Sequence, residues 1–197
     1  MDAHVGGPEA LALIELDSVA SGLRALDALV KKAPVSVLEA NLVEPGKFLV
    51  LVAGPIGELS EAFEAAAAEV PTAVGAKMFL ARVEQRVVDA LRGRDDREER
   101  PEAIGLVEGL AVAPTIEACD RSLKDARVRL AGIRVTGGLA GRAYYVVSGH
   151  QHDVEAALDA GRTVLEAHDS FHRVERIANP HAEMLAFLLR PIPFQAR

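Results

Sequence analysis

Apolar positions along the chain fall into two alternating patterns. Short apolar runs such as ALALIEL and KFLVLVAG are typical of buried strands, and between them apolar residues recur every three to four positions, which indicates helices. We expect strands near residues 10–16, 35–43, 47–53 and 76–81, and helices near 18–32, 57–69 and 84–91. This order predicts an α/β fold with a small sheet and helices packed on one side of it.

The same pattern recurs in the second half of the chain. An offset of 93 residues pairs Glu15 with Glu108, and also the following residues: Asp27 with Asp120, Lys31 with Lys124, and Val35 with Val128. The offset grows to 95 at Gly46 and Gly141, so the second copy carries two extra residues in the loop before that point. The chain is therefore predicted to be a tandem repeat of one domain.

The first helix of each copy carries one apolar row. In copy one the row is Val19, Leu23, Leu26 and Val30; in copy two it is Val112, Ile116, Cys119 and Leu123. We expect both rows to be buried. Cys119, the only cysteine, is then expected to act as a small buried hydrophobe.

Composition narrows the possible functions. The net charge of −7 argues against nucleic-acid binding, which needs a basic face. The longest apolar runs are too short to cross a bilayer, and the single cysteine suits a reducing cytoplasm. We expect a cytoplasmic protein with domains at residues 8–92 and 102–190, joined by a charged linker at 93–101.

The repeated strings resemble a known family, the tandem bacterial microcompartment shell proteins of the unpermuted type. The resemblance rests on ALALIELDSVASGLRALDALVKKAPV, AIGLVEGLAVAPTIEACDRSLKDARV, EPGKF and RIANPH. It implies two BMC domains, each a small, largely antiparallel sheet with helices on it. It also implies a homotrimer that fills the six positions of a hexamer, since a closed ring needs one interface type repeated around an axis. Such a trimer would tile into a facet with other shell proteins, both hexamers and pentamers, and pass small metabolites through a central pore.

The resemblance assigns two loops to the pore. The first contains Glu44, Pro45 and Gly46. In the propanediol-utilisation members a cysteine at the place of Glu44 ligates an iron–sulfur cluster; carboxylate is a poor substitute for thiolate, so we expect no cluster and no other cofactor or metal here. Three Glu44 side chains would form an acidic constriction that favours cations or neutral solutes. Without the resemblance, Glu44 would be a solvated acid beside a Pro-Gly turn.

The second predicted pore loop is rich in glycine. It comprises Gly137, Gly138, Leu139, Ala140 and Gly141. A phosphate-binding loop should open a helix, whereas this loop is expected to join two strands. We therefore expect its glycines to serve close backbone approach or positive φ near the axis.

Further positions resemble the edge at which neighbouring tiles meet. Lys31 and Lys124 occupy the same place at the end of the first helix, where a cation is also favoured by the helix dipole. Arg82 corresponds to an edge arginine that Asn179 replaces in copy two, while His181 is kept. We expect one edge to differ from the other.

Two other functions compete with a shell protein. Tandem α/β modules also act as regulatory binders of small molecules at copy interfaces. An enzyme is not expected, because no acid and base occur in a recognisable catalytic motif. The histidines His150, His152, His168 and His172 do not follow a zinc-binding spacing, and we expect them to be surface or structural residues.

Overall fold

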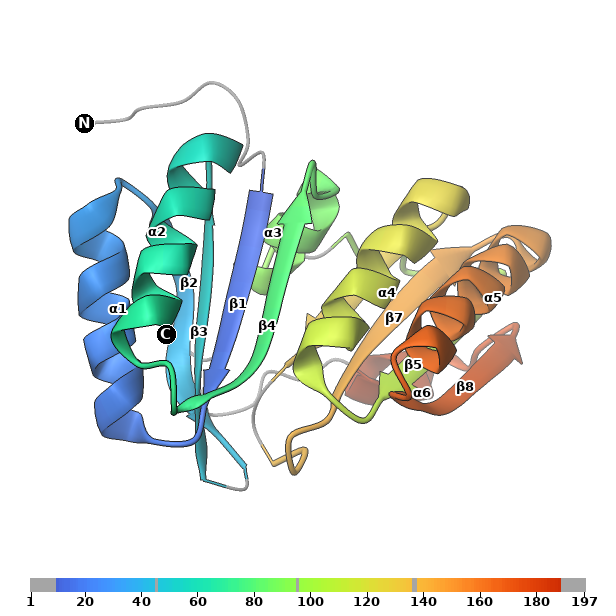
Figure 1. The fold of residues 1–197 in the computed structure, drawn as a ribbon. Coiled ribbons are helices and arrows are strands. Elements are labelled where there is room, and N and C mark those ends of the chain that lie inside the picture. Colours follow the sequence, from blue (N-terminus) through green and yellow to red (C-terminus); the bar gives the residue numbers. More distant parts are fainter. Residues whose placement is uncertain (1–9, 45, 95, 136–137, 189–197) are drawn as a thin grey trace. The chain divides into compact units, whose positions relative to one another are not determined.

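The computed structural model describes residues 10–44, 46–94, 96–135 and 138–188. The chain divides into two compact units, Met1–Val88 and Asp89–Arg197. Each unit has a four-stranded antiparallel sheet and two long helices, as the repeat predicts (Figure 1).

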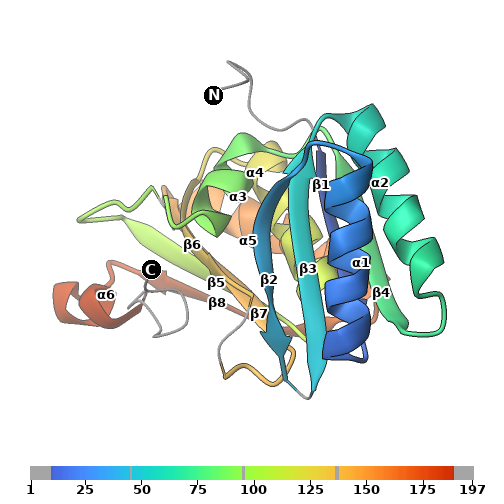
Figure 2. The ribbon, with the colours of Figure 1, turned by 90° about the vertical axis from the view of Figure 1, so that its left-hand side faces the viewer.

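Unit one follows the predicted order of elements. Its sheet has the strand order β2-β3-β1-β4, and α1 and α2 lie side by side on one face (Figure 2). The helix α1 begins after Ser18, whose Oγ accepts a hydrogen bond from the Ser21 N–H. The elements are β1 (Ala10–Leu16), α1 (Val19–Lys32), β2 (Ser36–Val43), β3 (Lys47–Gly54), α2 (Ile56–Glu69), β4 (Val74–Ala81) and, at the unit's end, α3 (Gln85–Leu91).

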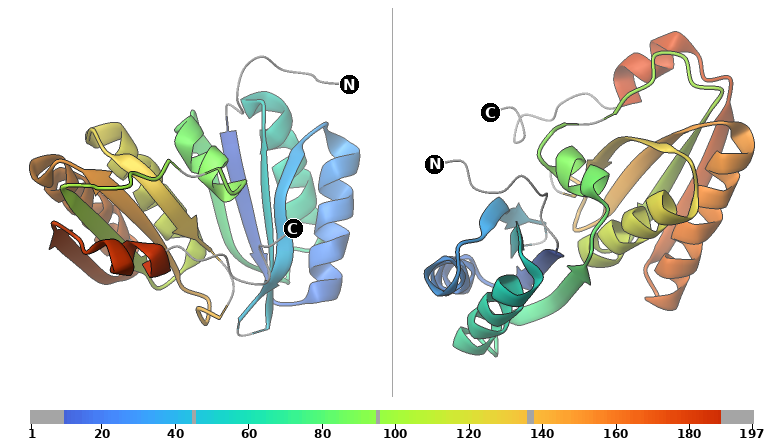
Figure 3. Two further views of the ribbon diagram at one scale, coloured as in Figure 1. Left: turned by 180° about the vertical axis from the view of Figure 1, so that it is seen from behind. Right: turned by 90° about the horizontal axis from the view of Figure 1, so that it is seen from above.

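Unit two repeats this arrangement with the strand order β6-β7-β5-β8. The helices α4 and α5 pack together on one face of the sheet. The short helix α6 lies on the other side of this sheet (Figure 3). Its residues Met184, Leu185 and Leu188 pack against the cluster of Ile104, Ala131 and Val146. The elements are β5 (Ala103–Gly109), α4 (Val112–Asp125), β6 (Arg129–Arg134), β7 (Ala143–Gly149), α5 (Gln151–Ala167), β8 (Phe171–Ala178) and α6 (Ala182–Leu188).

The cores of the two copies are filled differently at one layer near the start of the first helix. In unit one Gly22 lies under the Phe48 ring, and a Cβ at Gly22 would come within 2.6 Å of Cγ of that ring. In unit two the corresponding residues are Thr115 and Ala143. Thr115 lies instead against Gly109 of β5, where a Cβ would overlap Thr115 Oγ1, and Leu16 takes the place of Gly109 in unit one. The glycine that admits a side chain is therefore on the first helix in unit one and on a central strand in unit two.

A second layer of unit two contains a buried polar contact. The Ser122 hydroxyl donates to the Ala157 carbonyl at 2.6 Å and shares a hydrogen bond of 2.6 Å with the Tyr145 hydroxyl, which also lies 3.3 Å from the Ala118 carbonyl. Gly161 leaves room for Tyr145 Oη. The corresponding residues of unit one are apolar: Leu29, Val50 and Ala66.

The prediction that both first helices bury the same apolar row is wrong for unit one. On α4 the row is buried: Val112, Ile116, Cys119 and Leu123 are each at most 3% exposed. On α1, Val19, Leu23 and Val30 are 41%, 54% and 44% exposed. The buried positions of α1 are Gly22, Ala25 and Leu29, so this helix packs on its own sheet and α2 through a neighbouring row. The periodicity located an apolar row but not what covers it.

Candidate functional site

The first loop joins β2 to β3 at one end of the unit-one sheet. Glu44 is exposed, and Gly46 has φ +81°. A Cβ at Gly46 would meet nothing within 4 Å, so glycine is needed there for the backbone angle and not for space. Pro45 lies outside the described residues.

The second loop joins β6 to β7 at the corresponding end of the unit-two sheet. Gly138 and Gly141 have φ +81° and Ala140 has φ +52°. The Arg142 N–H donates to the Leu139 carbonyl at 3.0 Å and closes a turn. Leu139 is partly buried, and Gly137 lies outside the described residues. The loop joins two strands, which excludes the strand-to-helix geometry of a phosphate-binding loop.

Charged side chains stand at the base of both loops, and the sequence analysis missed them. Lys47, the first residue of β3, pairs with Glu15 at 3.1 Å. Arg142, just after the second loop, contacts His172, which faces Glu108. The repeat already indicated these contacts, because Glu15 and Glu108 occupy equivalent positions and a basic residue, Lys47 or Arg142, follows each loop at an offset of 95.

The two predicted edge lysines make the same contact in both copies. Lys31 Nζ donates to Asp27 Oδ2 and Lys124 Nζ to Asp120 Oδ2, each at 2.6 Å. Both lysines lie in the last turn of their helices, where the helix dipole favours a cation. The duplication has thus kept an i,i+4 pair at one end of the first helix.

The remaining edge positions follow the last strand of each sheet. Arg82 and Asn179 directly follow β4 and β8 and have φ +54° and +46°. Asparagine adopts this left-handed conformation more readily than arginine. In copy two the Nδ1 of His181 accepts a hydrogen bond from the Glu183 N–H at 3.3 Å, so His181 caps the start of α6.

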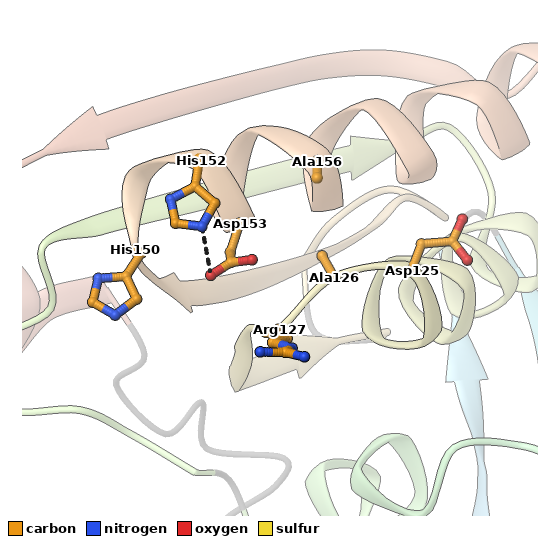
Figure 4. Close-up of a pocket in the computed structure, with 7 residues that line it drawn as sticks. All are labelled: Asp125, Ala126, Arg127, His150, His152, Asp153 and Ala156. Carbon is orange, nitrogen blue, oxygen red and sulfur yellow. Dashed lines mark ion pairs between the residues drawn. The ribbon is translucent and has the colours of Figure 1, made fainter.

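A polar pocket of about 630 Å³ lies between the end of α4 and the start of α5 (Figure 4). His150 Nδ1 lies 2.8 Å from Glu102 Oε2, and His152 Nε2 lies 3.4 Å from Asp153 Oδ2. The bond to Glu102 raises the pKa of His150, and the same bond lowers the pKa of Glu102. Both imidazoles are thus matched by carboxylates of the protein itself, and we assign this pocket no ligand.

The described residues contain neither a cluster of metal ligands nor a helix suited to a membrane. No group of three or more His, Cys, Asp or Glu side chains within residues 10–188, apart from the undescribed positions, is placed to hold a metal ion. In the same part of the chain, none of the helices combines the length and the apolar character needed to cross a bilayer.

Comparison with known proteins identifies the repeated domain. The family described as "BMC domain" matches twice, at residues 10–83 and 103–180. The chain is 32% identical over 150 residues to the bacterial microcompartment shell protein PduT of Citrobacter freundii, across 76% of this chain and 81% of that protein. It is also 34% identical over 83 residues to the shell protein EutM of Salmonella typhimurium, across 42% of this chain and 84% of EutM.

A solved structure matches across both units of the chain. A microcompartment protein from Desulfitobacterium hafniense superposes with a TM-score of 0.84 at 28% identity, covering 89% of this chain and 97% of that one. The single-domain span of the EutM match and the two-domain span of this structure agree with a duplicated domain.

Proposed function

Because the chain belongs to the BMC-domain family of bacterial microcompartment shell proteins, we propose that three chains close into a ring of six BMC domains with a pore at its centre. The ring tiles into a shell facet beside other shell proteins, hexamers and pentamers. Its relatives are structural shell proteins, which fits a protein that forms a wall and catalyses no reaction. Family membership also favours a shell protein over a small-molecule regulatory module.

The proposed ring rests on one observation, the different burial of the apolar rows on α1 and α4. One chain contains two equivalent apolar rows, of which the α4 row is buried and the α1 row, with Leu23 at its centre, is exposed. Soluble proteins seldom leave a contiguous apolar surface uncovered. A second copy of the chain, packed on α1, would bury the exposed row and give both rows the same environment. Repeating this contact head to tail closes a ring.

The pore assignment concerns the two loops. We infer that Glu44 to Gly46 of copy one and Gly137 to Gly141 of copy two, with Leu139 at its tip, surround the ring axis. The support is the equivalent place of the loops in the repeat, the exposure of Glu44, Gly46, Gly138 and Ala140, and the open space around Gly46 and Gly138. Three Glu44 carboxylates near the axis attract cations and repel anions, more strongly at low salt.

The edge assignment concerns the outer rim of the ring, where neighbouring tiles meet. We infer that Lys31 and Lys124 meet neighbouring tiles, together with Arg82 in copy one and Asn179 and His181 in copy two. The exchange of arginine for asparagine makes the two kinds of edge chemically different. Changing both lysines to alanine should leave the trimer intact and weaken flat sheets, which electron microscopy of concentrated protein measures. Sheets that form equally well would remove the lysines from the edge.

Native mass spectrometry tests the ring, because three chains of 20.9 kDa give a particle of about 63 kDa. A monomer at all concentrations would refute it.

Glu44→Gln tests the pore: in a reconstituted shell it should speed the entry of small anions about threefold or more, since three charges leave the constriction. The matched control is Glu58→Gln, a change of the same kind in the first turn of α2. Equal anion entry in both variants and in the unmodified shell would refute the pore assignment.

A further inference from the structure

We propose that Arg142, His172 and Glu108 form a pH-sensitive switch where the second loop meets the sheet. The equivalent contact in copy one does not respond to pH in the neutral range. The switch itself concerns contacts within unit two. Its effect on solute passage rests on the proposed pore.

Copy one shows the insensitive form of the contact. The Glu15 side chain is 5% exposed, and its Oε2 pairs with Lys47 Nζ at 3.1 Å. Between β1 and β4 the register shifts after Glu15, which leaves Gly75 as an extra residue without a strand partner. Neither partner is an imidazole, the side chain that ordinarily changes charge near neutral pH, so this contact lacks the group on which the switch depends.

Copy two has the same bulge with a different residue in it. The register between β5 and β8 shifts after Glu108, and the residue without a strand partner is His172. A bulge redirects a side chain relative to its neighbours in the strand. His172 Nε2 lies 3.1 Å from Arg142 Nη1 and 3.9 Å from Glu108 Oε2. The duplication has therefore placed an imidazole between the acid and the base at one loop only.

The contact with Arg142 shows that Nε2 of the His172 imidazole is unprotonated. A guanidinium group has only donors, so the hydrogen bond requires Nε2 of His172 to accept, and hence to carry no proton. Uptake of a proton at Nε2 removes that acceptor and places two cations side by side. The new N–H then points to the nearest acceptor, Glu108, where an ion pair replaces the former contact. Arg142 is released toward solvent.

The other charged groups around His172 do not compete for it. On its own strand, Arg173 lies opposite Glu108 in register but bonds Glu175 at 2.7 Å. Arg162 of α5 lies over the Phe171 ring, 5.0 Å from the ring centroid. In the part of the chain that the structure describes, Glu108 and Arg142 are the charged groups that contact the imidazole.

The switch acts on the loop through Arg142. Its backbone N–H closes the turn with Leu139, so its side-chain contact with His172 anchors the turn to the start of β8. Losing that contact loosens the turn that holds Leu139. In a ring of three chains, three added positive charges would also stand near the acidic constriction, and the preference for cations would fall.

A spin label on the loop tests the switch without assuming a pore. Leu139→Cys introduces one reactive thiol, because the native Cys119 is buried. Between about pH 8 and pH 5, the range in which imidazole ordinarily titrates, the mobile fraction of the label should rise about twofold. His172→Gln should abolish this rise, since an amide oxygen can accept from Arg142 at every pH. The matched control is His152→Gln, also in unit two, which should keep the rise.

Two results would overturn the switch: a label mobility that does not change with pH, or a rise that persists in His172→Gln. The pore is tested separately by the ratio of cation to anion permeability of the reconstituted shell. This ratio should fall about twofold on acidification in the native protein and stay constant in His172→Gln. A mobility change without any permeability change would refute the link to the pore while leaving the switch in place.

Discussion

Leu23→Asp should dissociate the proposed ring without unfolding the chain. Burying a leucine or valine side chain completely contributes about 1.5 to 3 kcal/mol. Leu23 is 54% exposed, and Val19 and Val30 are about as exposed, so covering the row contributes roughly 1 kcal/mol per residue, or about 3 kcal/mol per junction. Aspartate removes the roughly 1 kcal/mol that burial of Leu23 contributes to the junction. It also places a desolvated carboxylate there, which costs about 1 to 3 kcal/mol more.

The total of about 2 to 4 kcal/mol per junction corresponds to a dissociation constant raised roughly thirtyfold to thousandfold. Light scattering across a dilution series measures the shift from trimer to monomer. Denaturant unfolding of the monomer should change by less than about 1 kcal/mol, since an exposed site loses mainly helix propensity.

The matched change is Ile116→Asp at the same position of copy two. Ile116 is fully buried within the chain, so this change should lower the free energy of unfolding by several kcal/mol. A second control is Phe187→Asp, 59% exposed on α6, which should leave the trimer unchanged. A trimer that survives Leu23→Asp, or a Leu23→Asp chain as unstable as Ile116→Asp, would refute the assignment of the α1 row.

Two further predictions concern unit two alone. Gly161→Ala should lower the free energy of unfolding by about 1 to 3 kcal/mol, because the new Cβ would overlap Tyr145 Oη and come within 2.9 Å of a neighbouring serine Oγ; Tyr145→Phe should restore part of it in denaturant titrations. The Glu102 pKa is lowered and the His150 pKa raised, so their pair stabilises fully between about pH 4.5 and 6.5 and is lost as pH falls through the lowered value or rises through the raised one. In Glu102→Gln the Tm measured against pH should lose this maximum.

The sequence located the elements well because each copy repeats the same period. Strand and helix bounds follow from apolar spacing, and the second copy confirms each assignment of the first. Burial of an individual row could not be derived in this way, because Leu23 and Ile116 are both apolar and differ only in what surrounds them. Periodicity reports which side of a helix avoids water, not which molecule provides the cover.

Some residues of the candidate site could be named from the sequence, and others only from the structure. Glu44 and the second loop were assigned to the pore through the resemblance to a known family, whereas turn chemistry alone predicts only that Glu44 is a solvated loop residue. The contact of Arg142 with His172 joins positions 30 residues apart and depends on a bulge in the β5–β8 register. Neither residue type has a local signature for such a bulge, so only the three-dimensional pairing reveals it.

The different glycine positions in the two cores limit which single segments the two repeats could exchange without disturbing their packing. A recombinant that took β3 from copy one into copy two would set the Phe48 ring against Thr115 instead of Gly22, and the reverse exchange would leave Ala143 beside Gly22 with a void. Exchange of this strand alone between the two halves is therefore expected to destabilise the core, whereas exchange of the strand together with the first helix keeps the matching side chains.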